Sequence, residues 1–448
     1  MDETIRQSFI DYQNSLQAER DLCYVLGRQL PRSEISPGKI RNAGDKAKLI
    51  SSNDSSGFTY RGRFTDARQA ASISFEATQK AHNALKWLID RQGWRNGDQV
   101  ILCWGTKDQA LPSLQLDTYG LGLGLNERVE LPVQTYDQYA DRLNRALSGH
   151  YGEKLDELSQ VVVIGLDSAT PGRLSIVYYR ELEGSAFLQR VIRWHATCAW
   201  QIRSKMEPAG LDEERQTVYR PVTFYGAPAP EDIVLAAYGT KAGDKLKKAT
   251  IERLLPCIID GAPLPPDLVE CAVRRASTPV ALEDWEYRRT LDVACALVRK
   301  SRNDRLNSRR GETYKEVWTM SLDTATDERS YLFGRLLAYA DQAESLVLFK
   351  DKQNRLTNAL RMKHQFRLTP RTVWGYLDDR LTYYYRKLGD NGSWFRYEIS
   401  QVMTKFRPGD FSDERLDDTY LLGYYCQLAV LRSKKEEKPA GELDNFDH

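Results

Sequence analysis

The sequence predicts an α+β protein, with a mixed α/β N-terminal part that contains an antiparallel hairpin, followed by a C-terminal helical bundle. The hairpin prediction depends on two β-rich runs around a Pro-Gly turn, VVVIGLD at 161–167 and RLSIVYYREL at 173–182. From about residue 245, apolar residues recur at helical spacing, and the breaks fall at proline and glycine. Because 448 residues are too many for one compact core, we expect three parts, at residues 1–244, 245–319 and 320–448.

The N-terminal part is expected to contain two helices and a buried strand besides the hairpin. An early helix is predicted over about residues 3–20. A second is predicted over 75–92, where apolar residues keep helical spacing and Gly93 stands at the C-cap. The apolar run at 100–104 reads as the buried strand.

In the helical part, the best-specified helix spans 370–388, because Thr369 suits the N-cap, Pro370 the first turn and Gly389 the end. The basic stretch 301–311 is expected to be a loop or a frayed helix end. The other helices are expected over about 283–300, 326–349 and about 417–435.

Positive charge is segregated along a chain whose formal net charge is only +2. Residues 352–407 contain twelve Lys or Arg against four Asp or Glu, a local balance of about +8. Aromatic residues such as Trp374, Tyr376 and Tyr383 are interleaved with these cations. Cations neutralise phosphates and aromatic rings stack on unpaired bases, so this segment is expected to contact nucleic acid. The alternative is a solvated helix face beside a core stripe.

Two further segments add candidate contacts. The run RKSRNDRLNSRR at 299–310 is strongly basic, and the polar loop region 36–63 offers cations for phosphates and Asn53 for a base edge. The candidate nucleic-acid-binding residues are Lys39, Arg41, Lys46, Lys48, Asn53, Arg302, Arg305, Arg309, Arg310, Arg355, Arg361, Lys363, Arg367, Arg371, Arg386 and Lys387.

No catalytic constellation, metal site or cofactor is predicted. The five histidines form no HxxxH or HExxH pair. His195 and Cys198 are spaced as HxxC, which is either half of a zinc site or, as we favour, two residues of an aromatic-rich core helix. The segment GTKAGDK at 239–245 misses the phosphate-loop pattern because three residues, not four, separate its glycines. Asp167 is either a turn-initiating residue or the first acid of a nuclease sheet.

The bulk composition also bears on location. Seven cysteines occur without CxxC spacing, which fits reduced thiols better than a disulfide framework. No run of eighteen apolar residues occurs, and the N-terminus is polar and charged. We therefore expect a cytoplasmic protein without a membrane span or a secretory signal.

Several short motifs follow one another in a colinear order. The C-terminal third contains DERSYLFGRLLAYADQAE at 327–344, TPRTVWGYLDDRLTYYYRKL at 369–388 and DDTYLLGYYCQL at 417–428. Upstream, CYVLG at 23–27 and AKLISSN at 47–53 look like Cys-x-x-x-Gly and Leu-Ile-Ser-Phe-Asn elements, with Ser in place of Phe. In this order the motifs resemble the Csd-one family, the large subunit of type I-C CRISPR surveillance complexes (Cascade).

The resemblance implies a non-catalytic subunit that helps to recognise the protospacer-adjacent motif, stabilises the displaced strand and recruits the helicase-nuclease. The implied partners are the crRNA-bearing backbone and foot subunits of Cascade, the target double-stranded DNA with its displaced strand, and the helicase-nuclease. Family members usually have a further N-terminal region before the Cys-x-x-x-Gly element, which this chain is expected to lack. Members can also produce a C-terminal piece by internal translation. Either residues 320–448, beginning at Met320, fold alone as such a piece, or Met320 is an ordinary methionine in a linker.

Two other functions stay open on the residues alone. A metal-dependent nuclease would use Asp167 and other scattered acids, and the purified chain would cleave DNA when a divalent metal is added. A stand-alone DNA-binding protein outside any CRISPR complex would use the same basic segment, but it would not co-purify with a repeat-derived RNA.

Overall fold

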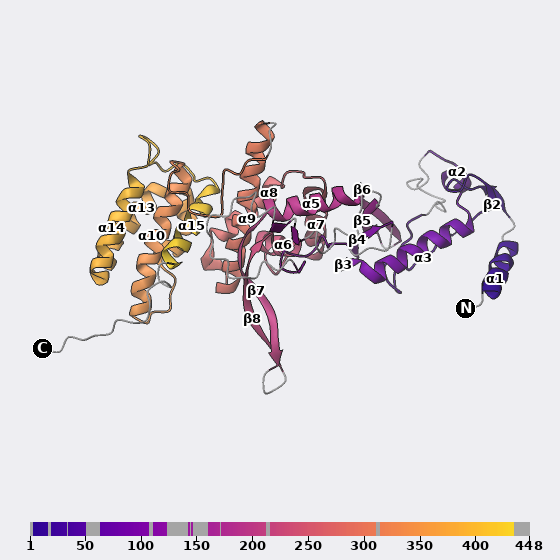
Figure 1. Ribbon diagram of the computed structural model, residues 1–448, viewed down its shortest axis with the longest axis horizontal. Helices are drawn as coiled ribbons and strands as arrows, with labels where there is room; N and C mark the ends of the chain where they lie inside the picture. Colours follow the sequence, from indigo (N-terminus) through magenta and orange to yellow (C-terminus); the bar gives the residue numbers. More distant parts are fainter. Residues whose placement is uncertain are drawn as a thin grey trace. The chain divides into compact units, whose positions relative to one another are not determined.

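The structure, a computed structural model, divides the chain into two compact units (Figure 1). The first unit holds residues 1–111 and 154–187, and the second holds 112–153 and 188–448. These bounds differ from the three expected parts. The residues that the structure describes are 3–16, 19–33, 35–50, 63–106, 111–122, 142–143, 145–146, 160–170, 172–211, 216–310 and 314–433.

The first unit is built on a four-stranded antiparallel sheet in the order β3-β4-β5-β6. Helix α3 (Phe75–Gln92) packs on β4, where its Ile89 joins a buried cluster that includes Val100 and Leu102. The predicted helix, strand and hairpin are confirmed. The four strands are β3 (Trp94–Asn96), β4 (Gln99–Gly105), β5 (Gln160–Thr170) and β6 (Arg173–Glu183).

The β5–β6 hairpin loses its regular register near its turn, between Asp167 and Thr170. Near that turn the loop that contains residues 41–48 is attached to the sheet, because Lys48 forms an isolated parallel bridge with Arg173. Four short elements come before α3 in the chain: α1 (Glu3–Leu16), β1 (Arg20–Leu22), β2 (Gln29–Pro31) and α2 (Ala67–Ala70).

The second unit is mainly helical, with one two-stranded antiparallel ribbon, β7 (Trp200–Leu211) and β8 (Thr217–Gly226). The far end of the ribbon extends beyond the helices of its own unit (Figure 1). Its described helices are α5 (Gly184–Thr197, from Leu188 on), α6 (Pro230–Tyr238), α7 (Asp244–Ile259), α8 (Pro266–Ala276), the short 3-10 helix η2 (Pro279–Ala281), α9 (Asp284–Arg310), α10 (Arg329–Lys350), α11 (Asn358–Arg361), α12 (Lys363–Leu368), α13 (Pro370–Leu388), α14 (Asp390–Met403) and α15 (Thr419–Ser433).

Helices α10 and α15 form the centre of this unit and are buried over most of their length. Each has a glycine where the other helix passes. A Cβ atom at Gly334 would clash with the carbonyl oxygen of Tyr420, and one at Gly423 would clash with the carbonyl oxygen of Tyr331. The two backbones therefore lie closer together than any side chain at these positions would allow.

A buried polar network surrounds this helix pair. Asp341 of α10 accepts hydrogen bonds from the hydroxyls of Thr357 (2.5 Å) and Tyr424 (2.7 Å). The ammonium of Lys363 is fully buried, lies 3.9 Å from the ring centroid of Tyr424 and donates to the hydroxyl of Tyr287 at 2.8 Å. Burial lowers the pKa of Lys363 from 10.5 to about 7.

The expected helices are present, with one correction. The helix at 370–388 is confirmed residue for residue as α13, with Gly389 at φ 58° after its last turn. The expected loop at 301–311 is wrong up to Arg310, because α9 continues to that residue. The amide oxygen of Asn303 accepts the backbone N–H groups of Val317 and Trp318, so the helix is held by contacts distant in sequence.

Independent folding of residues 320–448 stays a prediction. A separate piece would lack the hydrogen bond between the hydroxyls of Tyr420 and Ser277 and the one from Lys363 to Tyr287. Among the described residues, no helix is long and apolar enough to cross a membrane.

The glycine contact between α10 and α15 predicts a large decrease in stability in Gly334→Ala. We expect the free energy of unfolding to fall by about 3 kcal/mol, because the added methyl group must push two helix backbones apart. Gly375→Ala is the matched control, since a Cβ at Gly375 of α13 meets open space; this variant should gain about 0.5–1 kcal/mol. Urea unfolding of both variants measures the difference, and equal stabilities would contradict the packing argument.

Lys363 predicts a specific pH dependence. Its pKa of about 7 in the folded chain is below its ordinary 10.5, so between these values the unfolded chain binds more protons. This group therefore makes stability rise with pH by about 1.4 kcal/mol per unit above pH 7, and contributes no slope below it. The unfolding free energy of the natural chain minus that of Lys363→Met should increase from pH 7 to pH 9. Arg361→Met, at an exposed position nearby, should leave the slope unchanged.

Candidate nucleic-acid interface

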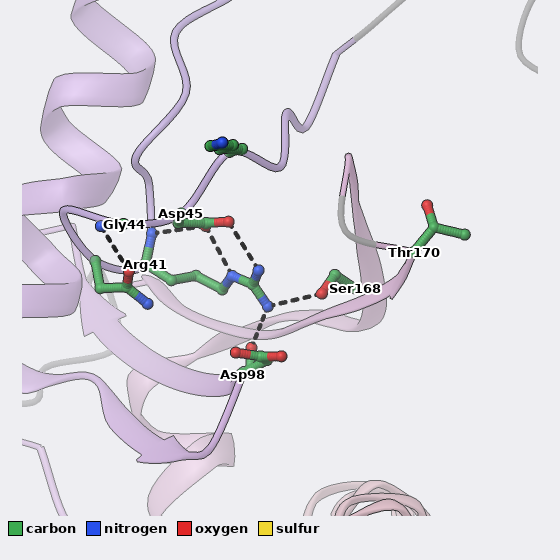
Figure 2. A pocket seen from close by; sticks show the side chains of 8 residues that line it. Arg41, Gly44, Asp45, Asp98, Ser168 and Thr170 are labelled. Atoms are coloured by element: carbon green, nitrogen blue, oxygen red, sulfur yellow. Dashed lines mark hydrogen bonds and ion pairs between the residues drawn. The ribbon is translucent and has the colours of Figure 1, made fainter.

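The first candidate site is a loop held against the sheet of the first unit by Arg41. The guanidinium makes a bidentate ion pair with Asp45, at 2.8 and 2.9 Å, and also donates to the carbonyl oxygen of Asp98 and the hydroxyl of Ser168, the latter at 3.1 Å (Figure 2). Both side chains of the ion pair are buried. The hydrogen bond that Arg41 donates lowers the pKa of the Asp45 carboxyl. Arg41 therefore positions the loop and is not itself exposed to a phosphate.

This arrangement borders a pocket of about 360 Å³ lined by three separate segments. The exposed side chains at its rim are those of Asn42, Lys46, Asp98 and Thr170, of which Figure 2 labels Asp98 and Thr170. The carboxamide oxygen of Asn42 accepts the N–H of Gly44 at 3.0 Å, which leaves its amide group as a donor. The rim thus offers one cation and neutral hydrogen-bonding groups, which are the kinds of side chain that contact a DNA backbone. It also carries the carboxylate of Asp98, which would repel a phosphate.

The other loop candidates have different environments. Lys39 is exposed and has a left-handed backbone, with φ 57°. Lys48 is half-buried, and its backbone pairs with the start of β6 through Gly172 and Leu174. Asn53 lies outside the described residues.

In the second unit, Arg361, Arg371 and Arg386 are exposed. They come from the end of α11, the first turn of α13 and the last turn of α13. Among the described residues, none of the three forms an ion pair, and Arg371 interacts electrostatically with the nearby carboxylate of Asp413. The charges of Arg361 and Arg386 are thus the more available to a partner. Arg355 and Lys387 are partly exposed but paired, with Glu344 at 2.8 Å and Asp351 at 2.5 Å.

Two candidates of this segment are buried. Lys363 is enclosed by tyrosines of α9 and α15, and Arg367 is 5% exposed and forms an ion pair with Glu270 at 2.7 Å. Neither side chain can reach a phosphate without opening the core, so both are left out of the surface considered below.

The basic run of α9 is largely engaged within the protein. Arg302 forms ion pairs with Asp418 and Asp417 of the chain before α15, the latter at 3.4 Å. Arg305 is exposed. The side chains of Arg309 and Arg310 lie outside the described residues.

The residues considered for metal or catalytic chemistry are structural where the structure describes them. His195 is buried and its Nδ1 lies 2.8 Å from the hydroxyl of Thr118, and burial lowers its pKa to about 3. Asp167 lies within β5, where it pairs with Ser175, and its carboxylate accepts the N–H of the adjacent Ser168 at 2.7 Å. The strand continues to Thr170, so the expected turn-initiating position of Asp167 is wrong. In the part of the chain that the structure describes, no three His, Cys, Asp or Glu residues are grouped so as to hold a metal ion.

Sequence reasoning missed the residues that complete the loop site. Asp98, Ser168 and Thr170 come from two turns far from residues 41–46 in the chain, and no local pattern relates these segments. Arg380, one of the cations that are interleaved with aromatic residues in the sequence, was not among the candidate contacts, and its guanidinium lies over the ring of Tyr376. Their spacing of four residues on a predicted helix was a usable signal.

Comparison with known proteins gives one family match and no significant match among curated proteins. Residues 1–432 match the family described as CRISPR-associated protein (Cas_Csd1), which is nearly the whole chain and includes both candidate sites. The family consists of large subunits of type I-C Cascade. The chain therefore belongs to the Cas_Csd1 family.

Proposed function

We propose that this chain is a non-catalytic large subunit that aids recognition of the protospacer-adjacent motif, stabilises the displaced strand and recruits the helicase-nuclease. The observation that carries the proposal is the family match over residues 1–432. The exposed cations of α11 and α13 support the DNA-binding part of it, since Arg361, Arg371 and Arg386 form no ion pair among the described residues.

The physical logic is a division of labour between RNA and protein. Base pairing with the guide reads the sequence, and exchanging a DNA duplex for an RNA–DNA hybrid is nearly balanced in free energy. Cations that neutralise phosphates can therefore shift that balance. Exposed cations meet this need, whereas buried ones such as Lys363 hold the protein together.

The loop site suits contact with duplex DNA beside the motif. Its backbone is fixed by the Arg41–Asp45 ion pair, and Lys39 and Lys46 remain exposed. A rigid loop presents these cations without a large loss of conformational entropy on binding. We assign Lys46 to a phosphate and Asn53 to a base edge.

Co-purification tests membership of a complex. The full chain, tagged and expressed with the other Cascade proteins and a CRISPR array, should bring down a repeat-derived RNA and the backbone subunits. Recovery of the chain with DNA but without RNA would favour a stand-alone DNA-binding protein. Cleavage of DNA by the purified chain on addition of a divalent metal would favour a nuclease.

The helical surface predicts a salt-dependent contribution to DNA binding. The triple variant Arg361→Ala, Arg371→Ala and Arg386→Ala should weaken binding of target DNA by the complex. The log–log dependence of affinity on salt should become shallower by about 0.7–0.9 for each phosphate that the variant no longer neutralises. A control that removes equal charge is Lys241→Ala, Lys245→Ala and Arg288→Ala, at exposed positions on other parts of the unit. The same slope in both triple variants would refute this surface.

The loop site predicts two different effects on motif recognition. Lys46→Ala should weaken binding about equally for every adjacent motif, because a phosphate carries no sequence information. Asn53→Ala should change the ranking of motifs, at about 1–3 kcal/mol for the base that it contacts. Lys80→Ala on α3, also exposed, controls for removal of a lysine in the same unit. Binding of a library of motif variants measures the ranking, and an unchanged ranking in Asn53→Ala would make this residue structural.

A further inference from the structure

One face of α13 alternates aromatic and cationic side chains. Tyr376, Arg380, Tyr383 and Lys387 are spaced by four, three and four residues, which places them in one row along the helix. All four side chains are exposed, and the tyrosines are 41% and 56% exposed. We call these four residues the tyrosine–cation row.

Each tyrosine of the row has a cation over its ring. The guanidinium carbon of Arg380 lies 4.3 Å from the ring centroid of Tyr376, and the ammonium of Lys387 lies 5.2 Å from that of Tyr383. Lys387 is also held by Asp351 of the α10 C-cap at 2.5 Å. The cations therefore keep fixed positions beside the rings, and a ring has a second face on which another flat group can stack.

Helix stability does not account for these tyrosines, and packing accounts for them only in part, since the ring of Tyr383 lies edge to face with that of Tyr384, 5.3 Å between centroids. The core of α13 is made by other residues, including Leu377, Leu381 and Tyr384, which are buried. Tyrosine is a poorer helix former than lysine, glutamate or alanine at an exposed position. Two exposed tyrosines with cations in register are the combination that binds unpaired bases.

We propose that the tyrosine–cation row binds single-stranded nucleic acid, with unpaired bases stacked on Tyr376 and Tyr383 and phosphates close to Arg380 and Lys387. The two tyrosines are seven residues apart, about 10.5 Å along the helix. This distance is about three times the 3.4 Å axial spacing of successive phosphates in one strand of a duplex. The two stacked bases would therefore be about three nucleotides apart in one strand rather than adjacent.

The charges around the row are mixed, because the carboxylate of Asp351 already pairs with Lys387. Arg386 is exposed three residues after Tyr383 and adds a phosphate contact. Asp379 is also exposed, one residue before Arg380, and it would repel a phosphate. The inference rests on the proposed function, because the displaced strand is the unpaired strand that such a complex offers.

The test uses the full chain and a twenty-nucleotide oligothymidylate, with a second oligonucleotide that carries one 2-aminopurine. The affinity of the double variant Tyr376→Ala and Tyr383→Ala should fall about thirty-fold, taking about 1 kcal/mol for each stacked base. Its salt slope should stay unchanged, because no charge is removed. The quenching of 2-aminopurine fluorescence that stacking produces should also disappear.

Two control variants separate stacking from other effects. Tyr376→Phe with Tyr383→Phe keeps both rings and should bind as the natural chain does. Tyr397→Ala removes a tyrosine of α14 that is 59% exposed and outside the row, and it should have no effect. Equal decreases in affinity in the Phe and Ala double variants would overturn the proposal, because the hydroxyls and not the rings would then be responsible.

The outcomes also distinguish the row from the proposed function. If the natural chain binds the oligonucleotide with a strong salt dependence and the Ala double variant binds equally well, stacking is refuted and DNA binding stands. If the natural chain shows no salt-dependent binding, alone or in the complex, both proposals fail. If the Ala double variant binds normally but no longer enters the complex, the row contacts a protein, which also refutes stacking.

Discussion

The close approach of α10 and α15 is the constraint on which the second unit depends. Gly334 and Gly423 each lie against a backbone carbonyl of the opposite helix, so the two helices can pass only with glycine at these points. Their hydroxyls and carboxylates are then enclosed and must find partners inside the protein. Asp341 is satisfied by Thr357 and Tyr424, which attaches the segment after α10 to α15.

The burial that this packing imposes also explains which cations lie inside the protein and which face solvent. An arginine or lysine inside a protein is tolerated when a carboxylate or a ring compensates it, as Glu270 does for Arg367 and Tyr424 does for Lys363. The basic segment therefore divides into cations that connect helices and cations that face solvent. Its net charge of about +8, counted along the sequence, overstates the positive charge of the surface, since charge counting takes no account of burial.

The sequence predicts a feature well when the signal for it is local in the chain. Helix α13 was predictable to the residue because Pro370 and Gly389 are local signals at its two ends. The continuation of α9 to Arg310 was not, because Asn303 secures it through Val317 and Trp318, which lie beyond the helix in the chain. The same limit applies to the sites. Arg361 and Lys363 are two cations only two residues apart, and the sequence does not show that the first is exposed and the second buried. The loop pocket joins segments that share no sequence pattern.

Three consecutive tyrosines, Tyr383, Tyr384 and Tyr385, show how buried contacts determine which side chains of α13 are exposed. Tyr384 is buried and its hydroxyl donates to Glu344 at 2.9 Å, while Tyr385 is buried where α14 begins, against Gly392. A Cβ at Gly392 would clash with the carbonyl oxygen of Tyr385, so the turn between α13 and α14 is also fixed. These two anchors set the rotation of α13 about its axis. Tyr383, about 100° away from Tyr384 around the helix, then has to point to solvent. The buried carboxylate of α10 thereby decides which ring α13 presents.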